Sequence, residues 1–318
     1  MAEQTDPWFL RGNWRPMLEE RTETELQVQG SIPPELQCVY LRTGPNPKSG
    51  KGDHWFLGDG MLHGIRLSNG KAEWYRNRFV QTPDITAPLT DPGAGLGDLR
   101  RGKGNTHVMA HNKKILCLEE AHWPWSVDGE LNTIGCENFS EALTCSMTAH
   151  PKVCPTTGEL LAFSYFNFAQ PYLNYVRIGA DGQLKQLEGI ELPQMVMMHD
   201  FNITENYVVF MDLPLALDLD LLATGIPFRF KRESGARLGV MPRKGRASDA
   251  VSPSPACPIL PSRTAISALA RSISGAKLPK AAWSMVSSPA SLALRVSSCC
   301  WRSEGPAQVT LKLSLIHI

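Results

Sequence analysis

The sequence of 318 residues lacks an excess of charge of either sign. Its 32 Lys and Arg residues nearly cancel its 31 Asp and Glu residues, which leaves a formal net charge of +1 at pH 7. Nucleic-acid-binding proteins usually concentrate positive charge, so this balance gives no electrostatic case for a nucleic-acid partner. The sequence also lacks any apolar run that approaches the ~20 residues of a membrane-spanning helix.

Metal-binding and disulfide motifs based on cysteine are missing as well. The eight cysteines form no Cys-x-x-Cys pair, and the adjacent Cys299 and Cys300 fit neither a zinc site nor a disulfide framework. The first residues after Met1 have neither the basic region nor the apolar region of a secretory signal peptide. We therefore expect a cytoplasmic protein with reduced thiols.

The composition changes abruptly near Asp249. Between Val251 and Ile318 there is no Asp, Tyr or Phe, and Glu304 is the sole acidic residue. Ser, Ala and Pro dominate this segment, and its apolar residues follow neither the period of a strand nor that of a helix. We expect two parts in consequence, a folded part over residues 1–249 and an irregular, disordered tail over residues 250–318.

Short strands separated by turns are predicted as far as about Phe210. Turn residues at 68–70, which include an Asn-Gly pair, separate predicted strands at 65–67 and 72–75, and turn residues at 180–182 separate strands at 173–178 and 184–190. Further strands are expected at 108–118 and 160–166. Because no helical pattern intervenes, the sequence predicts an all-β fold, which leaves a sandwich, a barrel and a propeller open.

Two histidines lie at the ends of separate predicted strands. His150 is followed by Pro151, which restricts His150 to an extended backbone, and His199 ends the apolar run 195–198. A single histidine is more often a hydrogen-bonded core or surface residue than a metal ligand. A stiff β scaffold, however, can hold the geometry that a metal requires. Imidazole binds Fe, Zn, Cu and Ni, so the residue type leaves the metal open.

A series of short motifs extends through the first three quarters of the chain. They occupy residues 32–36, 40–47, 54–63, 75–80, 105–107, 118–120, 148–152 and 198–210. Their composition and order resemble the carotenoid cleavage oxygenase family, which includes carotenoid and lignostilbene dioxygenases. The resemblance covers roughly Trp14 to Asp249 and stops where the composition changes.

The resemblance implies a seven-bladed β-propeller with iron on its axis, of which residues 1–249 would form an incomplete part. Members of the family hold Fe(II) with four histidines, and glutamates orient three of them. By position in the motifs, His150 matches the first ligand, His199 matches the second, and Glu120 matches the glutamate that orients the second. The other two ligands would follow Asp249, where no matching motif occurs.

The implied reaction is the oxidative cleavage of a conjugated carbon–carbon double bond. O2 supplies one oxygen atom to each half of the substrate, which gives two carbonyl products. The resemblance implies an apolar substrate, either a carotenoid, an apocarotenoid or a stilbene. No residue in the sequence chooses among them.

An apolar segment that begins at Leu213 and ends at Leu222 allows two interpretations. In the family, a nonpolar segment near this place lines the substrate entrance and can contact membranes. The alternative is a buried helix between blades, which we favour because Asp218 and Asp220 would oppose an anionic lipid surface.

The segment after Asp249 lacks the strands that the family has there, and residues 313–318 look like a translated sequencing adapter. We therefore expect a frameshifted, truncated reading frame whose product is inactive. Two other classes stay open: a metal-free propeller fragment that binds a ligand or partner, and the nonfunctional product of a gene or of sequence assembly. Reading the encoding DNA past codon 249 in the other two frames distinguishes these possibilities.

Overall fold

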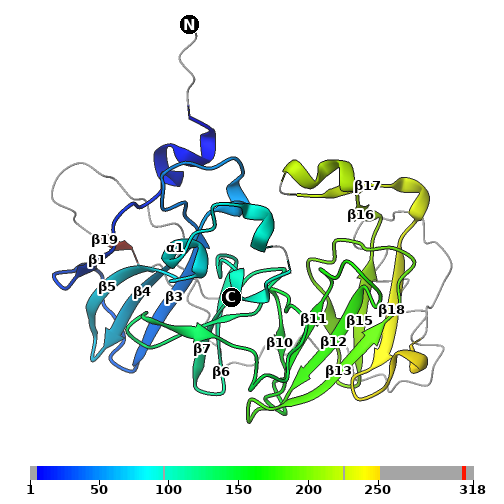
Figure 1. Cartoon of the computed structure of the whole chain (residues 1–318). Helices are drawn as coiled ribbons and strands as arrows, with labels where there is room; N and C mark the ends of the chain where they lie inside the picture. The colour runs from blue at the N-terminus through cyan, green and yellow to red at the C-terminus, as the bar shows by residue number, and fades with distance from the viewer. Residues whose placement is uncertain (1–5, 96, 225, 251–309, 313–318) are drawn as a thin grey trace, which may run out of the picture.

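The computed structural model describes residues 6–95, 97–224, 226–250 and 310–312, and its architecture is all-β. Antiparallel sheets follow one another in chain order, from the blue and cyan sheet at the left of Figure 1 to the green and yellow sheets at the right. The described residues contain a single α-helix, α1 (Pro83–Thr86). The predicted all-β class is therefore confirmed.

Three sheets have four strands each. The first has the order β1-β5-β4-β3, and the other two follow the chain as β6-β7-β8-β9 and β10-β11-β12-β13. Their bounds are β1 (Arg21–Glu23), β3 (Cys38–Pro45), β4 (Gly60–Ser68), β5 (Lys71–Phe79), β6 (His107–His111), β7 (Lys114–Leu118), β8 (Trp125–Val127), β9 (Thr133–Cys136), β10 (Lys152–Val153), β11 (Leu160–Ser164), β12 (Leu173–Ile178) and β13 (Leu184–Ile190).

A fourth sheet has the order β14-β15-β18. Separately, β16 forms an antiparallel pair with β17, and β2 forms a parallel pair with β19. The bounds are β2 (Gln27–Gln29), β14 (Asn202–Ile203), β15 (Tyr207–Asp212), β16 (Leu215–Leu217), β17 (Phe228–Phe230), β18 (Arg237–Pro242) and β19 (Thr310–Lys312). Short 3-10 helices connect the strands: η1 (Trp8–Leu10), η2 (Gly12–Trp14), η3 (Trp55–Leu57), η4 (Pro92–Gly95), η5 (Leu99–Arg101), η6 (Leu219–Thr224), η7 (Arg232–Ser234) and η8 (Ala247–Asp249).

Both predicted hairpins are confirmed. Asn69 and Gly70, with φ of 49° and 75°, connect β4 to β5, and the turn at 180–182 connects β12 to β13. The single strand predicted at 108–118 is wrong, because it is a hairpin of β6 and β7. Its turn residues Asn112 and Lys113 both have positive φ. Neither is glycine, the residue that usually marks such a turn, so the sequence contains no clear turn signal here.

The core lies between consecutive sheets. Leu62 and Trp74 of the first sheet pack with Cys117 and Trp125 of the second. A second cluster joins the second sheet to the third, and a third cluster joins the third sheet to the fourth. Each sheet therefore buries its faces against its neighbours, which fixes the positions of the loops that lead from one sheet to the next.

The expectation of a buried helix at 213–222 is wrong. Residues 215–217 form β16 and residues 219–224 form η6, while Leu213 and Leu219 are 43% and 64% exposed. The physical reason is pairing with a later segment: Leu215–Leu217 form an antiparallel ladder with Phe228–Phe230, and Asp218 forms an ion pair with Arg229 of that strand. Elsewhere in the described part of the chain, too, no helix is long and apolar enough to cross a membrane.

The expected disordered tail lies largely outside the described residues, as do the adapter-like residues 313–318, and the division at residue 249 stays a prediction. Thr310–Lys312 are the exception, because they form β19 beside β2. A parallel pair forms through backbone hydrogen bonds, so Thr310–Lys312 can pair with β2 although the segment lacks an alternating apolar pattern.

Candidate metal centre

The three predicted site residues lie in loops that flank strands of consecutive sheets. Glu120 follows β7 of the second sheet, His150 precedes β10 of the third, and His199 precedes β14 of the fourth. β10 and β14 are the first strands and the edge strands of their sheets. The packing of one sheet on the next therefore brings these loops together.

The side chains of Glu120, His150 and His199 form one cluster. Each offers a ligand atom, and these atoms lie within 4.8 Å of one another. The two imidazole rings have a centroid separation of 4.4 Å and an interplanar angle of 70°. Among the described residues, this is the single group of three or more potential metal-binding side chains at such distances.

Glu120 lies against one nitrogen of His199. Its Oε1 is 2.7 Å from His199 Nδ1, and this contact raises the pKa of His199 although partial burial opposes the rise. A carboxylate beside Nδ1 favours the tautomer with the proton on Nδ1 and leaves the lone pair on Nε2. The His199 side chain is 56% exposed, so Nε2 belongs to a ring that solvent can reach.

His150 has a different environment. Burial, followed by the nearby His199, lowers the pKa of His150, which favours the neutral imidazole. Its Nε2 atom is buried and has no hydrogen-bond partner among the described residues. A buried polar atom without a partner needs an explanation, and a neutral imidazole nitrogen that faces a second imidazole and a carboxylate fits a metal ion of the iron type.

Two further side chains around this cluster were missed in the sequence. Tyr165, which follows β11, donates a hydrogen bond from its hydroxyl to Glu120 Oε2 at 3.0 Å. His107, at the start of β6, contacts the carbonyl of Ala149 through Nδ1 at 2.9 Å, and its ring stacks on His150. The position of His107 in the motif at 105–107 could have marked it, whereas no sequence signal distinguishes Tyr165 from a core tyrosine.

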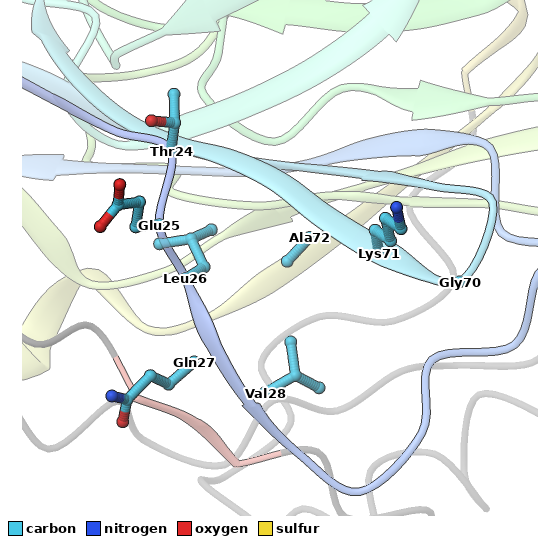
Figure 2. A pocket seen from close by; sticks show the side chains of 8 residues that line it. All are labelled: Thr24, Glu25, Leu26, Gln27, Val28, Gly70, Lys71 and Ala72. Carbon is cyan, nitrogen blue, oxygen red and sulfur yellow. The ribbon is translucent and has the colours of Figure 1, made fainter.

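A groove elsewhere on the molecule has no connection with this cluster. It has a volume of about 470 Å³ and is lined by residues 24–28 and by the turn between β4 and β5 at residues 70–72 (Figure 2). Its lining includes none of the three cluster residues. The cluster therefore lies at the sheet junctions and not in this groove.

Comparison with known families identifies the class. Residues 14–260 match the model of the retinal pigment epithelial membrane protein family. The match covers most of the chain, and the chain belongs to this family, the carotenoid cleavage oxygenases. The resemblance read from the motifs is confirmed.

Two curated relatives illustrate the similarity. The chain is 40% identical over 255 residues to a carotenoid cleavage oxygenase of Mycobacterium tuberculosis, which covers 77% of the chain and 50% of the relative. It is 38% identical over 272 residues to a carotenoid 9,10(9',10')-cleavage dioxygenase of Crocus sativus, which covers 74% of the chain and 50% of the relative. The chain thus spans about half the length of the curated relatives it matches.

Solved structures agree with the fold. The lignostilbene dioxygenase of Pseudomonas brassicacearum superposes with a TM-score of 0.69 at 32% identity, covering 78% of this chain and 56% of that one. An apocarotenoid oxygenase from Synechocystis gives a TM-score of 0.63 at 21% identity, over 76% of this chain and 57% of that one. The sheets of this chain are therefore arranged as in propellers of the carotenoid oxygenase family.

Proposed function

We propose that this chain carries part of the iron centre of a dioxygenase that cleaves a conjugated carbon–carbon double bond, with His150 and His199 as ligands to Fe(II). The observation that carries the proposal is the buried, unpartnered Nε2 of His150 within a cluster that also contains His199 and Glu120. Iron is typical of the family, and the donor set of imidazoles suits it.

In this proposal each side chain has a distinct role. His150 and His199 hold the ion through neutral imidazole nitrogens, and Glu120 keeps the proton of His199 on Nδ1. Bound Fe(II) would supply the redox chemistry that allows O2 to react with an alkene. The packed sheets fix the loops that carry the ligands, so the substrate double bond can be held in one position relative to the site.

The names of relatives support an apolar conjugated substrate. They include carotenoid cleavage dioxygenases, a resveratrol cleavage oxygenase of Aspergillus fumigatus that is 32% identical, and a lignostilbene dioxygenase. We infer that the substrate is a carotenoid, an apocarotenoid or a stilbene, that O2 is the co-substrate, and that two carbonyl compounds are the products.

We further propose that the chain by itself binds iron weakly and does not turn over substrate. The described residues contribute two imidazoles and one carboxylate to the cluster. Affinity for a metal depends on the number of ligands and on the groups that orient them, so a pair of imidazoles releases iron easily.

Peripheral contact with a membrane through residues 213–222 is a second part of the proposal. Leu219 is 64% exposed, and Phe230 of the adjacent β17 is 56% exposed. Asp218 pairs with Arg229, which neutralises one of the two acidic groups that would disfavour a lipid surface. Cosedimentation with neutral lipid vesicles tests this contact: the chain should bind, and replacing Leu219 by Glu should abolish binding. Equal cosedimentation of both forms would contradict it.

A chimaera tests the proposed reaction. The first 249 residues are joined to the second half of the Mycobacterium tuberculosis relative, loaded anaerobically with Fe(II), and given O2 with a carotenoid or a stilbene. Aldehyde products should form and should disappear when His199 is replaced by Ala. A folded, iron-loaded chimaera that forms no aldehyde from either substrate class would overturn the proposal.

A further inference from the structure

Tyr165 approaches the candidate metal centre from the core side. Its ring is 2% exposed and belongs to the same buried cluster as Met198 and Phe201, the residues on either side of the segment that carries His199 and Asp200. The ring packs against Phe163 at a centroid distance of 6.0 Å. A side chain held in this way has one rotamer available, so its hydroxyl has a fixed position.

The hydroxyl of Tyr165 and the ring of His199 contact opposite oxygens of the same carboxylate. Tyr165 donates to Glu120 Oε2 at 3.0 Å, while Glu120 Oε1 lies 2.7 Å from His199 Nδ1. Contacts at both oxygens restrict the rotation of a carboxylate more than a contact at one oxygen does. These two contacts connect the Tyr165 hydroxyl to the His199 ring through Glu120.

We propose that Tyr165 is a positioning residue of the metal centre, which acts on His199 through Glu120. This inference rests on the proposed function for its role in metal binding, but the chain of contacts from Tyr165 to His199 exists without a metal. Removing the hydroxyl should leave Glu120 free to rotate and should reduce the fraction of His199 that carries its proton on Nδ1.

The test is a Co(II) titration of the full chain followed by visible absorption. Tyr165→Phe keeps the ring and removes one oxygen atom, and we expect about 3- to 10-fold weaker Co(II) binding, as for the loss of one ordinary hydrogen bond. Tyr175→Phe is the matched control. Tyr175 is also fully buried, but its hydroxyl donates to the carbonyl of Arg243 and not to the metal centre. This control should bind Co(II) as the wild type does.

A double variant separates a positioning role from a general loss of stability. If Tyr165 acts through Glu120, Tyr165→Phe should have no further effect on Co(II) affinity in a chain that already carries Glu120→Gln. Losses that multiply in the double variant would overturn the inference. The inference would also be overturned if Tyr165→Phe bound Co(II) as tightly as the wild type while Glu120→Gln bound it more weakly. That result would leave the proposed function intact.

The metal-free chain provides an independent readout. With 15N-labelled histidine, NMR reports which ring nitrogen of His199 carries the proton. Tyr165→Phe should shift the proton of His199 toward Nε2, and Tyr175→Phe should not. If the wild type binds no Co(II), the proposed metal centre fails, yet this shift would still support the positioning role of Tyr165. An unchanged tautomer would overturn it.

Discussion

At the scale of single residues, Glu120 is distinguished from its neighbour Glu119 by what each carboxylate contacts. Glu120 lies beside His199 Nδ1, whereas Glu119 pairs with His122 and accepts a hydrogen bond from the backbone N–H of Ala121. The two adjacent glutamates therefore serve different histidines. Only Glu120 belongs to the cluster that could hold a metal ion.

This difference gives a prediction with an internal control. Glu120→Gln keeps the size of the side chain and removes its charge, and it should weaken metal binding by roughly ten- to a hundredfold, the usual effect of losing a group that orients a ligand. Glu119→Gln should change the affinity little. Isothermal titration of each variant with Co(II) checks both. Equal affinity of the wild type and Glu120→Gln would remove Glu120 from its orienting role.

The family resemblance of their motifs predicted that His150, His199 and Glu120 share one site, and their side chains form one cluster in the structure. Tyr165 could not be found in this way. Its role depends on where its hydroxyl points, and that direction depends on a core cluster that Tyr165 shares with Met198 and Phe201 from a distant part of the chain. Side-chain direction in a core is a tertiary property.

At the scale of elements, the start of β4 packs directly on the backbone that leads into β6. A Cβ atom added at Gly60 would lie 2.1 Å from the carbonyl oxygen of Lys103. Backbone cannot move aside as a flexible side chain can, so this approach requires glycine. The motif at 54–63 thereby joins the first sheet to the segment that begins the second.

Gly60→Ala should therefore destabilise the chain by about 3 kcal/mol, the upper end of the usual cost of overpacking. Gly44→Ala is the matched control, because Gly44 lies on the paired strand β3 and an added Cβ would meet nothing within 4 Å. Urea unfolding midpoints of the two variants measure the difference. If both variants had the same midpoint, the close approach at Gly60 would have no energetic importance.

An ion cluster joins the third sheet to the fourth. Glu159 pairs with Arg177 at 2.6 Å and with Arg243 at 3.3 Å, and Arg243 also donates to the carbonyl of Glu205. Burial opposes ionisation of Glu159, but its hydrogen bonds with Arg177 and Thr157 prevail and hold its pKa below the ordinary value of 4.5. The ionised carboxylate therefore stabilises the folded state.

This lowered pKa predicts a pH-dependent effect. Glu159→Gln should cost about 2 kcal/mol at pH 7, because it leaves the buried Arg243 and the partly buried Arg177 without a charged hydrogen-bond partner. The stability from the ionised carboxylate is present above pH 4.5 and is lost as the pH falls through the lower folded pKa. Denaturant unfolding from pH 7 downward should show the difference between wild type and variant shrinking in acid. A constant difference would contradict this explanation.

At the scale of the whole molecule, the pattern of short strands and turn residues in the sequence predicted an all-β fold but not its architecture. The strands at 173–178 and 184–190 were predicted with their observed bounds, because alternation and turn residues are local. The order of sheets around the site depends on cores shared by distant strands, so the propeller could be inferred only from the family resemblance. The segment at 213–222 was misread because its apolar content resembles a core helix, whereas Leu215–Leu217 pair as a strand with Phe228–Phe230.

The edge of the fourth sheet gives a prediction about association. Among the described residues this sheet has three strands, and β18 forms its edge, whereas the preceding sheets have four strands. An edge strand with unpaired backbone groups can pair with another chain. We expect the purified chain to associate as its concentration rises. Light scattering over a series of concentrations checks this. A chain that stays monomeric at every concentration would contradict it.

The central claim is that His150 and His199 together hold the metal. Anaerobic dialysis of the full chain against excess Fe(II), followed by elemental analysis, measures it directly. The wild type should retain iron weakly and saturably, up to one ion per chain. The double variant His150→Ala, His199→Ala should retain no iron above background. His54→Ala is the control, because His54 caps η3 and lies outside the cluster. It should retain iron as the wild type does. Equal iron retention by the wild type and the double variant would contradict the account.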